Sequence, residues 1–251
     1  MSLDRFYFGD SNWALDAKVE LEGGEARHLI RVLRKKVGEE VTLFDGLGKT
    51  ARAVIVETDR RTARLRIISI EESAAKVACQ IRLIVALPRA GGAAEVLRKS
   101  VEAGASEIQP LIAKRSVHRP EKKDESQRQR KFLEHAITAI KQCERNLIPE
   151  LLNPVRVESL SLAAGEWGVY GCVRNEAVTL RQFEKSVGGC PRRVVVVIGP
   201  EGGLDQLEED QLSERGFQAI RCVPQVLRVE TAVCAFLTHF AGATADELVQ
   251  E

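Results

Sequence analysis

The run Val194–Ile198, with the loop that follows it, restricts the fold of this 251-residue chain more than any other segment. Five consecutive β-branched apolar residues predict a strand that is buried on both faces, which is typical of parallel sheets covered by helices. The loop Gly199–Gly203 follows at once, and its glycines let a backbone approach a ligand closely. Ligands of open α/β sheets bind beyond the carboxyl ends of the strands, so this is a candidate binding loop. A plain strand-to-helix turn, with Asp205 near the helix start, is the alternative interpretation.

Strands and helices alternate through most of the chain after about residue 76, which predicts a parallel α/β sheet. The expected strands, besides Val194–Ile198, are Ile81–Leu87, Glu107–Ile112, Gly168–Val173 and Phe217–Val223. The expected helices include Ala93–Ala103, a long polar helix from about Asp124 to Asn146, and a last helix from about Glu230 to Ala245. We therefore predict two domains, residues 1–75 and residues 76–251.

The first 75 residues have the pattern of a small β-barrel. Val41–Phe44 and Thr50–Val56 are β-rich runs on either side of a glycine-rich turn, which predicts a hairpin. Ala63–Ile68 alternates as a half-buried strand does, and Glu25–Leu33 is the one segment with a helical pattern. Gly48-Lys49-Thr50 resembles the end of a phosphate-binding loop, but Leu43 stands where that loop needs its first glycine, so we expect a hairpin turn instead.

Composition is that of a folded chain, with 44% hydrophobic and 29% charged residues. No stretch approaches the roughly 20 apolar residues that cross a bilayer, and no apolar signal region follows Met1, so we expect a cytoplasmic protein without a membrane partner. The six cysteines have no metal-ligand spacing. We therefore expect reduced, structural cysteines and no metal site.

The net charge of +1 conceals an uneven distribution. Residues 1–160 carry 29 basic and 23 acidic residues, whereas residues 161–251 carry 8 and 13. Arg27, Arg31, Arg34, Lys35 and Lys36 lie within ten residues, and a second group consists of Arg60, Arg61, Arg64 and Arg66. Such clusters suit the phosphates of a nucleic acid, although a solvated charged face is the more common explanation.

A second candidate loop lies in Val223–Ala232, between the strand Phe217–Val223 and the last helix. It contains a charged pair, Arg228 and Glu230, beside a second strand end. Two loops of this kind at neighbouring strand ends favour a site, while a helix-capping carboxylate beside an arginine is the bland alternative.

Several blocks in their order make the chain similar to one family. These blocks are Arg5-Phe6, His28–Arg34 with Gly38, Phe44-Asp45-Gly46, Lys99–Gly104, Gln142–Arg145 with Pro149, Ile198–Gly203, and Leu227-Arg228 with Glu230-Thr231-Ala232. The chain resembles the small-subunit ribosomal RNA uridine-N3 methyltransferases (RsmE) of the SPOUT superfamily.

The resemblance implies an N-terminal PUA-like barrel that holds RNA and a C-terminal α/β domain with a trefoil knot that holds S-adenosylmethionine. It also implies a homodimer that acts on 16S rRNA of the 30S subunit and methylates N3 of one uridine.

The resemblance further implies a set of site residues. The cofactor-binding residues would lie in three loops after strands: Cys172, Val173, Ile198, Gly199, Pro200, Glu201, Gly202, Gly203, Cys222, Val223, Pro224, Val226, Leu227 and Arg228. The catalytic residues would be Arg228, Glu230 and Glu201, with a carboxylate near the reacting proton and Arg228 stabilising developing charge. The RNA-binding residues would be Arg5, His28, Arg31, Arg34, Lys35 and Arg145.

Three positions depart from the pattern of this family. Val223 stands where the family usually has glycine, Gln225 where it has arginine, and Arg89 where it often has lysine. Three alternatives are a ribose 2′-O methyltransferase of the same superfamily, a non-catalytic RNA-binding protein of the same fold, and a nucleotide-dependent enzyme. The segment Leu227–Thr231 lacks the Asn-rich motif of the first, Val223 is the one hint of the second, and Leu43 counts against the third.

Overall fold

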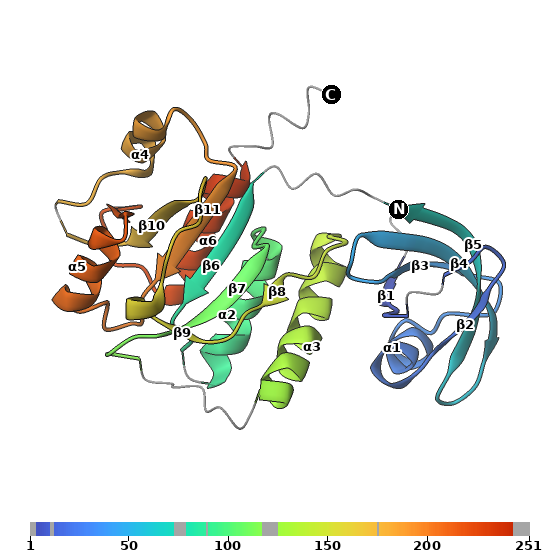
Figure 1. Ribbon diagram of the computed structural model, residues 1–251. Helices are drawn as coiled ribbons and strands as arrows, with labels where there is room; N and C mark the ends of the chain where they lie inside the picture. Colours follow the sequence, from blue (N-terminus) through green and yellow to red (C-terminus); the bar gives the residue numbers. More distant parts are fainter. Residues whose placement is uncertain are drawn as a thin grey trace. The chain divides into compact units, whose positions relative to one another are not determined.

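The chain forms two compact units in the computed structural model, which describes residues 4–10, 13–72, 79–88, 90–116, 125–174 and 176–242. The first unit consists of Met1–Lys76 together with Ile140–Ile148, and the second consists of Val77–Ala139 and Pro149–Glu251 (Figure 1). The boundary expected between residues 75 and 76 falls outside the described residues, as does Arg89.

The first unit contains a five-stranded sheet in the order β1-β3-β4-β5-β2. Its strands are β1 (Arg5–Tyr7), β2 (Lys18–Leu21), β3 (Glu40–Phe44), β4 (Lys49–Thr58) and β5 (Ala63–Glu72). The pair β3–β4 is antiparallel, which confirms the predicted hairpin; Gly48 lies in its turn, and Lys49 and Thr50 begin β4. In the described residues β1 and β2 remain the two edges, so the predicted barrel takes the form of an open half-barrel.

The helical segment of this unit has two parts. Helix α1 (Gly23–Arg27) runs directly into a π-helical turn, His28–Val32, in which the Leu33 amide donates to the His28 carbonyl at 3.0 Å. Ala26 and Leu29 are fully buried in the core of the unit, against Phe6 and the inner faces of the strands. Burying this one stripe explains why the segment is helical although strands surround it.

The segment Ile140–Ile148 completes the first unit although it lies far along the chain. The Arg5 guanidinium donates to the Arg145 carbonyl at 2.9 Å and to Asn146 Oδ1 at 2.6 Å. Gly48 N–H donates to the Asn146 carbonyl, and Ile148 N–H donates to the Gly46 carbonyl. Backbone bonds therefore join this segment to the β3–β4 turn.

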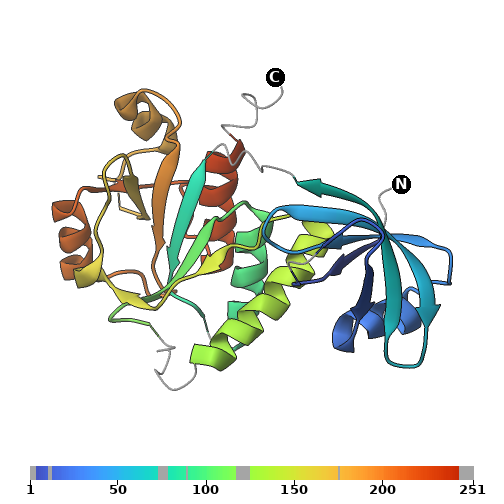
Figure 2. The same cartoon turned by 45° about the vertical axis from the view of Figure 1, so that its right-hand side comes forward.

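The second unit is built on a parallel sheet in the order β12-β10-β11-β6-β7-β8, with β9 pairing to β7 (Figures 1 and 2). Its strands are β6 (Gln80–Val85), β7 (Glu107–Ile112), β8 (Glu150–Leu151), β9 (Val155–Arg156), β10 (Trp167–Gly171), β11 (Arg193–Ile198) and β12 (Phe217–Ile220). Every pairing is parallel, which confirms the predicted α/β architecture. Val194–Ile198 in β11 are all buried, between β6 and β10.

Helices cover this sheet. They are α2 (Ala90–Glu102), α3 (Glu125–Cys143), α4 (Leu180–Val187), α5 (Gln206–Glu214) and α6 (Val229–Gly242). Helix α6 packs on β6, β11 and α2, while α4 and α5 contact β12 (Figure 2). The strand expected to reach Val223 ends at Ile220, because the chain leaves the sheet there to form a loop. The long helix ends at Cys143, since Glu144 takes a positive φ of 60°.

We predict that Gly46→Ala destabilises the first unit by about 1–2 kcal/mol or more, because Gly46 has a φ of +79° that disfavours any side chain. Its new methyl group would also overlap the Ile148 side chain. Thermal unfolding and amide exchange in β3 and β4 measure the effect. Gly24→Ala on α1, where a methyl group meets nothing within 4 Å, is the matched control and should leave stability unchanged or slightly higher. Equal stability of the two variants would contradict the expected strain.

Candidate functional site

A cavity of about 260 Å³ lies at the carboxyl ends of three neighbouring strands in the second unit. Gly171 ends β10, Ile198 ends β11 and Ile220 ends β12, and all three line the cavity. The loops that follow these strands supply most of the remaining wall, and α5 and α6 supply the rest. This is the place where parallel α/β sheets bind ligands.

The wall combines small, apolar and glycine residues with few charged side chains. The lining residues are Gly171, Cys172, Val173, Ile198, Gly199, Pro200, Glu201, Gly202, Gly203, Leu204, Glu209, Ile220, Cys222, Val223, Gln225, Val226, Leu227, Val229, Ala232 and Phe236. An apolar wall with a few convergent polar groups is typical of small-molecule and cofactor sites.

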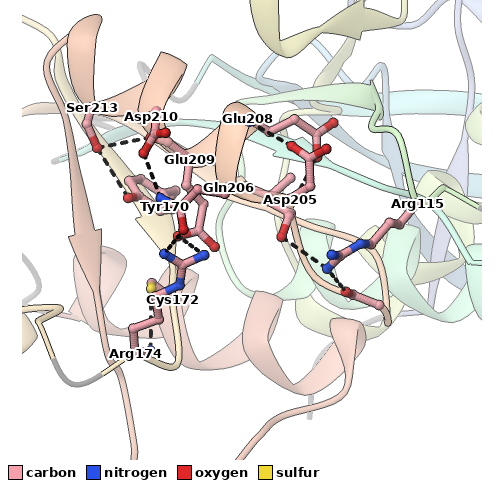
Figure 3. Close-up of polar contacts among 12 residues, drawn as sticks. Arg115, Tyr170, Cys172, Arg174, Asp205, Gln206, Glu208, Glu209, Asp210 and Ser213 are labelled. Atoms are coloured by element: carbon pink, nitrogen blue, oxygen red, sulfur yellow. Dashed lines mark hydrogen bonds and ion pairs between the residues drawn. The ribbon is translucent and has the colours of Figure 1, made fainter.

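The loop Gly199–Gly203 is shaped by its glycines. A Cβ on Gly199 would lie 3.0 Å from the Leu204 side chain, so the close turn after β11 requires glycine there. Gly203 has a φ of +68°, and its N–H donates to the Pro200 carbonyl at 2.8 Å. From the loop after β7, Arg115 donates to the Gly202 carbonyl at 2.8 Å and so fixes the far side of this loop (Figure 3).

The start of α5 fixes the end of the same loop. Asp205 Oδ1 accepts from Glu208 N–H, and Glu208 accepts from Asp205 N–H, both at 2.9 Å. This reciprocal arrangement satisfies the free amides of the first helical turn. Lys114 lies 2.8 Å from Asp205 Oδ2, and its hydrogen bond, together with the bond from Glu208 N–H, lowers the pKa of Asp205. The C-terminal part of the candidate loop is therefore fixed both by Arg115 and by the cap of α5.

A polar cluster at one wall of the cavity joins β10, its loop and α5 (Figure 3). Arg174 forms an ion pair with Glu209 at 3.2 Å and also donates to Gln206. The Tyr170 hydroxyl lies 3.3 Å from Ser213 Oγ, and burial raises the pKa of Tyr170. Burial also raises the pKa of Glu209, whereas Arg174 opposes that shift.

The structure brings together most of the residues that the sequence assigned to a cofactor. Twelve of the fourteen line the cavity, including Val223. Pro224 and Arg228 are not among the described residues that line the cavity, although Leu227 and Val229, on either side of Arg228, are. Arg228 is exposed and its carbonyl accepts from Ala232 N–H at 2.9 Å, so it caps the start of α6.

The two candidate carboxylates occupy different positions. Glu201 is exposed in the loop and lines the cavity, while Glu230 is half-buried in the first turn of α6. Among the described residues, Glu201 therefore lines the cavity, whereas Glu230 is not one of its lining residues.

Eight lining residues were outside the sequence assignment: Gly171, Leu204, Glu209, Ile220, Gln225, Val229, Ala232 and Phe236. Gly171 and Ile220 are strand ends, which the alternation of strands and helices could have located. Glu209 and Phe236 lie on helices, and only the packing of α5 and α6 over the strand ends brings them to the wall.

The residues assigned to RNA all lie in the first unit, but their surroundings differ. Arg5 is half-buried over the Phe44 ring at 5.1 Å, and burial lowers the pKa of both Arg5 and Arg145. Burial, with Lys141 nearby, also lowers the pKa of His28, so at neutral pH this ring is uncharged. These three groups are partly withdrawn from solvent.

The basic segment after α1 is more accessible. Arg31 and Arg34 are exposed, and Arg34 takes a φ of +54°. Lys35 is half-buried in ion pairs with Asp4 at 2.7 Å and Glu39 at 3.2 Å. In the second basic group, Arg64 and Arg66 also lie in ion pairs with carboxylates.

Other classes of site find no support in the part of the chain that is described. No group of three potential metal ligands occurs there, and none of the six cysteines, all of which are described, forms a disulfide. No described helix has the length and apolar character needed to span a membrane.

Comparison with known families gives two matches. Residues 75–241 match the RNA methyltransferase domain family, and residues 21–68 match the RNA methyltransferase PUA domain family. Among curated proteins, the ribosomal RNA small subunit methyltransferase E of Synechocystis sp. is 29% identical over 221 residues, which are 87% of this chain and 71% of that protein. The enzyme of the same name from Mycobacterium tuberculosis is 28% identical and covers 86% of this chain and 83% of its own length.

Solved structures agree over almost the whole chain. A Legionella pneumophila protein solved with the bound cofactor SAM has a TM-score of 0.87 and 30% identity, covering 97% of this chain and 98% of that one. The ribosomal RNA small subunit methyltransferase E of Neisseria gonorrhoeae, bound to S-adenosyl methionine, has a TM-score of 0.83 and 29% identity, covering 96% and 97%. The resemblance drawn from the sequence blocks is thus confirmed, and the chain belongs to the RNA methyltransferase family, with an N-terminal PUA domain.

Proposed function

We propose that this protein transfers a methyl group from S-adenosylmethionine to N3 of one uridine in 16S rRNA. The cavity at the ends of β10, β11 and β12 carries this proposal, because it lies in the domain that matches the RNA methyltransferase family. Relatives of similar length are ribosomal RNA small subunit methyltransferases E, and one of them was solved with S-adenosyl methionine. The family resemblance further supports a trefoil knot, a homodimer and action on the 30S subunit in the cytoplasm.

The residues of the cavity fit S-adenosylmethionine. Apolar side chains such as Ile220, Leu227 and Phe236 suit the faces of an adenine ring, and the glycine-rich loop presents backbone groups to its polar edges. Gly171 also keeps the wall open, since a Cβ there would lie 3.3 Å from Ile198 Cδ1. Val223 is one of the lining residues, so a bound cofactor would lie next to its side chain.

The cofactor supplies an electrophilic methyl group on its sulfonium, and the protein must align N3 of uracil with it. N3 carries a proton at neutral pH, so a carboxylate has to accept that proton as the N–C bond forms and the S–C bond breaks. Glu201 and Glu230 are the candidates, because Glu201 lines the cavity and Glu230 lies in the first turn of α6, two residues after Arg228. Arg228, exposed beside the cavity, would stabilise the negative charge that develops on the uracil oxygen.

RNA recognition would use exposed arginines of the first unit. Arg31 and Arg34 are exposed, whereas Lys35, Arg64 and Arg66 are paired with carboxylates. We therefore assign phosphate contacts chiefly to Arg31 and Arg34. Arg5 and Arg145 are better suited to a partly buried contact, since burial lowers the pKa of both and Arg5 lies over the Phe44 ring.

The reaction predicts a defined chemical product. Deleting the gene should remove one 3-methyluridine from 16S rRNA, and adding the purified protein with S-adenosylmethionine to 30S subunits of that strain should restore it. Mass spectrometry of rRNA fragments measures both effects. A lost methyl group on a ribose 2′ oxygen would instead support the other methyltransferase class, and an unchanged rRNA would contradict the proposed function.

Arg228→Ala should lower the rate of methylation by about 10²–10³-fold, the loss typical of removing a group that stabilises developing charge. Its affinity for S-adenosylmethionine should stay within about twofold of wild type, because Arg228 is exposed beside the cavity and is not one of its lining residues. Single-turnover methylation and calorimetry separate the two quantities. Arg181→Ala, an exposed arginine on α4, is the matched control. Near-normal turnover of the Arg228 variant would remove this role.

Replacing Arg31 and Arg34 together by Ala should weaken RNA binding and reduce the slope of log K against log salt by about 0.7–0.9 for each lost phosphate contact. The matched control replaces Arg64 and Arg66, which are already paired within the unit and should change the slope little. Binding isotherms between low and high salt measure the slopes. An unchanged slope in the first variant would exclude Arg31 and Arg34 from the interface.

A further inference from the structure

Glu209 is the less exposed of the two charged residues among the described residues that line the cavity. It follows the binding loop on the first turn of α5, and only 14% of its side chain is exposed. The other carboxylate among the described lining residues, Glu201, is exposed. Withdrawing a carboxylate from water is unfavourable unless partners replace the lost hydrogen bonds. Its position therefore needs a physical explanation.

The ion pair with Arg174 provides part of that explanation. Arg174 lies on the loop after β10, and its Nη2 approaches Glu209 Oε2 at 3.2 Å while Nη1 donates to Gln206 (Figure 3). The Arg174 side chain is 41% exposed, so it reaches Glu209 from the solvent side. The pair thus links the first cavity loop to α5 and holds the carboxylate in one place.

Arg174 does not use the full capacity of the carboxylate. An ionised carboxylate offers about four acceptor positions, and the ion pair occupies one oxygen. The other acceptor positions of Glu209 are not occupied by this ion pair, and Glu209 lines a cavity whose wall is otherwise mainly apolar or glycine. Glu209 is consequently equipped to accept hydrogen bonds from a molecule bound there.

The neighbouring cation indicates which donors suit this carboxylate. Arg174 already balances the charge of Glu209, so it would repel a second cation bound there, whereas it would not repel a neutral hydrogen-bond donor. A ribose offers two adjacent neutral hydroxyl donors, and carboxylates recognise ribose hydroxyls in the same way at other α/β nucleotide sites.

We propose that Glu209 is a cofactor-binding residue that accepts hydrogen bonds from the ribose hydroxyls of the cofactor, and that Arg174 is its positioning residue. This inference rests on the proposed function, because it assigns a contact to the same cavity. On this proposal Glu209 recognises the nucleoside part of the ligand, and its contact does not depend on the sulfonium or on the amino-acid end.

The test is calorimetric titration of the full-length protein with three ligands that share the ribose: S-adenosylmethionine, S-adenosylhomocysteine and 5′-methylthioadenosine. Glu209→Gln should weaken the binding of all three by a common factor of about tenfold or more, as expected for hydrogen bonds to a charged acceptor. Asp210→Asn is the matched control, since Asp210 is exposed and accepts from Gln206 on the same helix. This control should stay within about twofold of wild type.

Arg174 supplies a second, independent variant. Arg174→Ala should lower the affinity for all three ligands by a common factor smaller than that of Glu209→Gln. Arg174→Lys should recover part of this loss, because a cation again faces Glu209. A purely structural role for Arg174 would lower the melting temperature without this common factor or its rescue.

Several results would overturn the assignment. A greater loss for S-adenosylmethionine than for S-adenosylhomocysteine would mean that Glu209 recognises the sulfonium charge. Retained affinity for 5′-methylthioadenosine alone would place Glu209 at the amino-acid end. Unchanged affinity of the Glu209 variant for all three would exclude a cofactor contact while leaving the proposed function intact. A wild-type protein that binds none of them would instead refute the proposed function, and the assignment with it.

Discussion

The pairing of β11 between β6 and β10 is the constraint on which the second unit depends. Its five apolar residues, Val194–Ile198, are buried on both sides, so helices must cover both faces of the sheet. Parallel pairing then brings the ends of β10, β11 and β12 to one edge. The cavity is a consequence of this arrangement, because each chain segment has to leave the sheet there and turn towards a helix.

The elements that were predictable are those with strong local signals. The strand Glu107–Ile112 has the predicted bounds, and the β3–β4 hairpin follows from its turn residues. The segment Glu25–Leu33 was predicted to be helical, but hydrophobic spacing does not distinguish an α-helix from the π-helical turn at His28–Val32. Strand β12 ends at Ile220, three residues before the predicted end at Val223. A β-branched residue such as Val223 favours a strand by propensity even where the chain has left the sheet.

The candidate site was predictable where it lies on loops after strands, and not where it depends on packing. Glycine and proline marked Gly199–Gly203 directly. The spacing of Asp205 and Glu208 marks Glu208 as a capping residue of α5. Nothing local distinguishes Glu209 from Asp210, although Glu209 lines the cavity and Asp210 is exposed. These two carboxylates differ only in the direction that the helix gives them. The basic excess of residues 1–160 is divided between the two units. The first unit has 16 basic and 14 acidic residues, whereas Val77–Ala139 of the second unit has 12 and 7. The second unit as a whole has 21 basic and 22 acidic residues, so its basic excess is confined to Val77–Ala139.

The return of Ile140–Ile148 to the first unit has a consequence for synthesis. The half-barrel draws backbone partners for its β3–β4 turn, and the partner of Arg5, from a segment made some 70 residues after its last strand. During translation the N-terminal unit therefore stays incomplete until α3 and the residues after it, as far as Ile148, have been made. A fragment that stops after β5 would lack these contacts as well. The two units are interleaved along the chain, so Val77–Ala139 of the second unit is made before the first unit is complete.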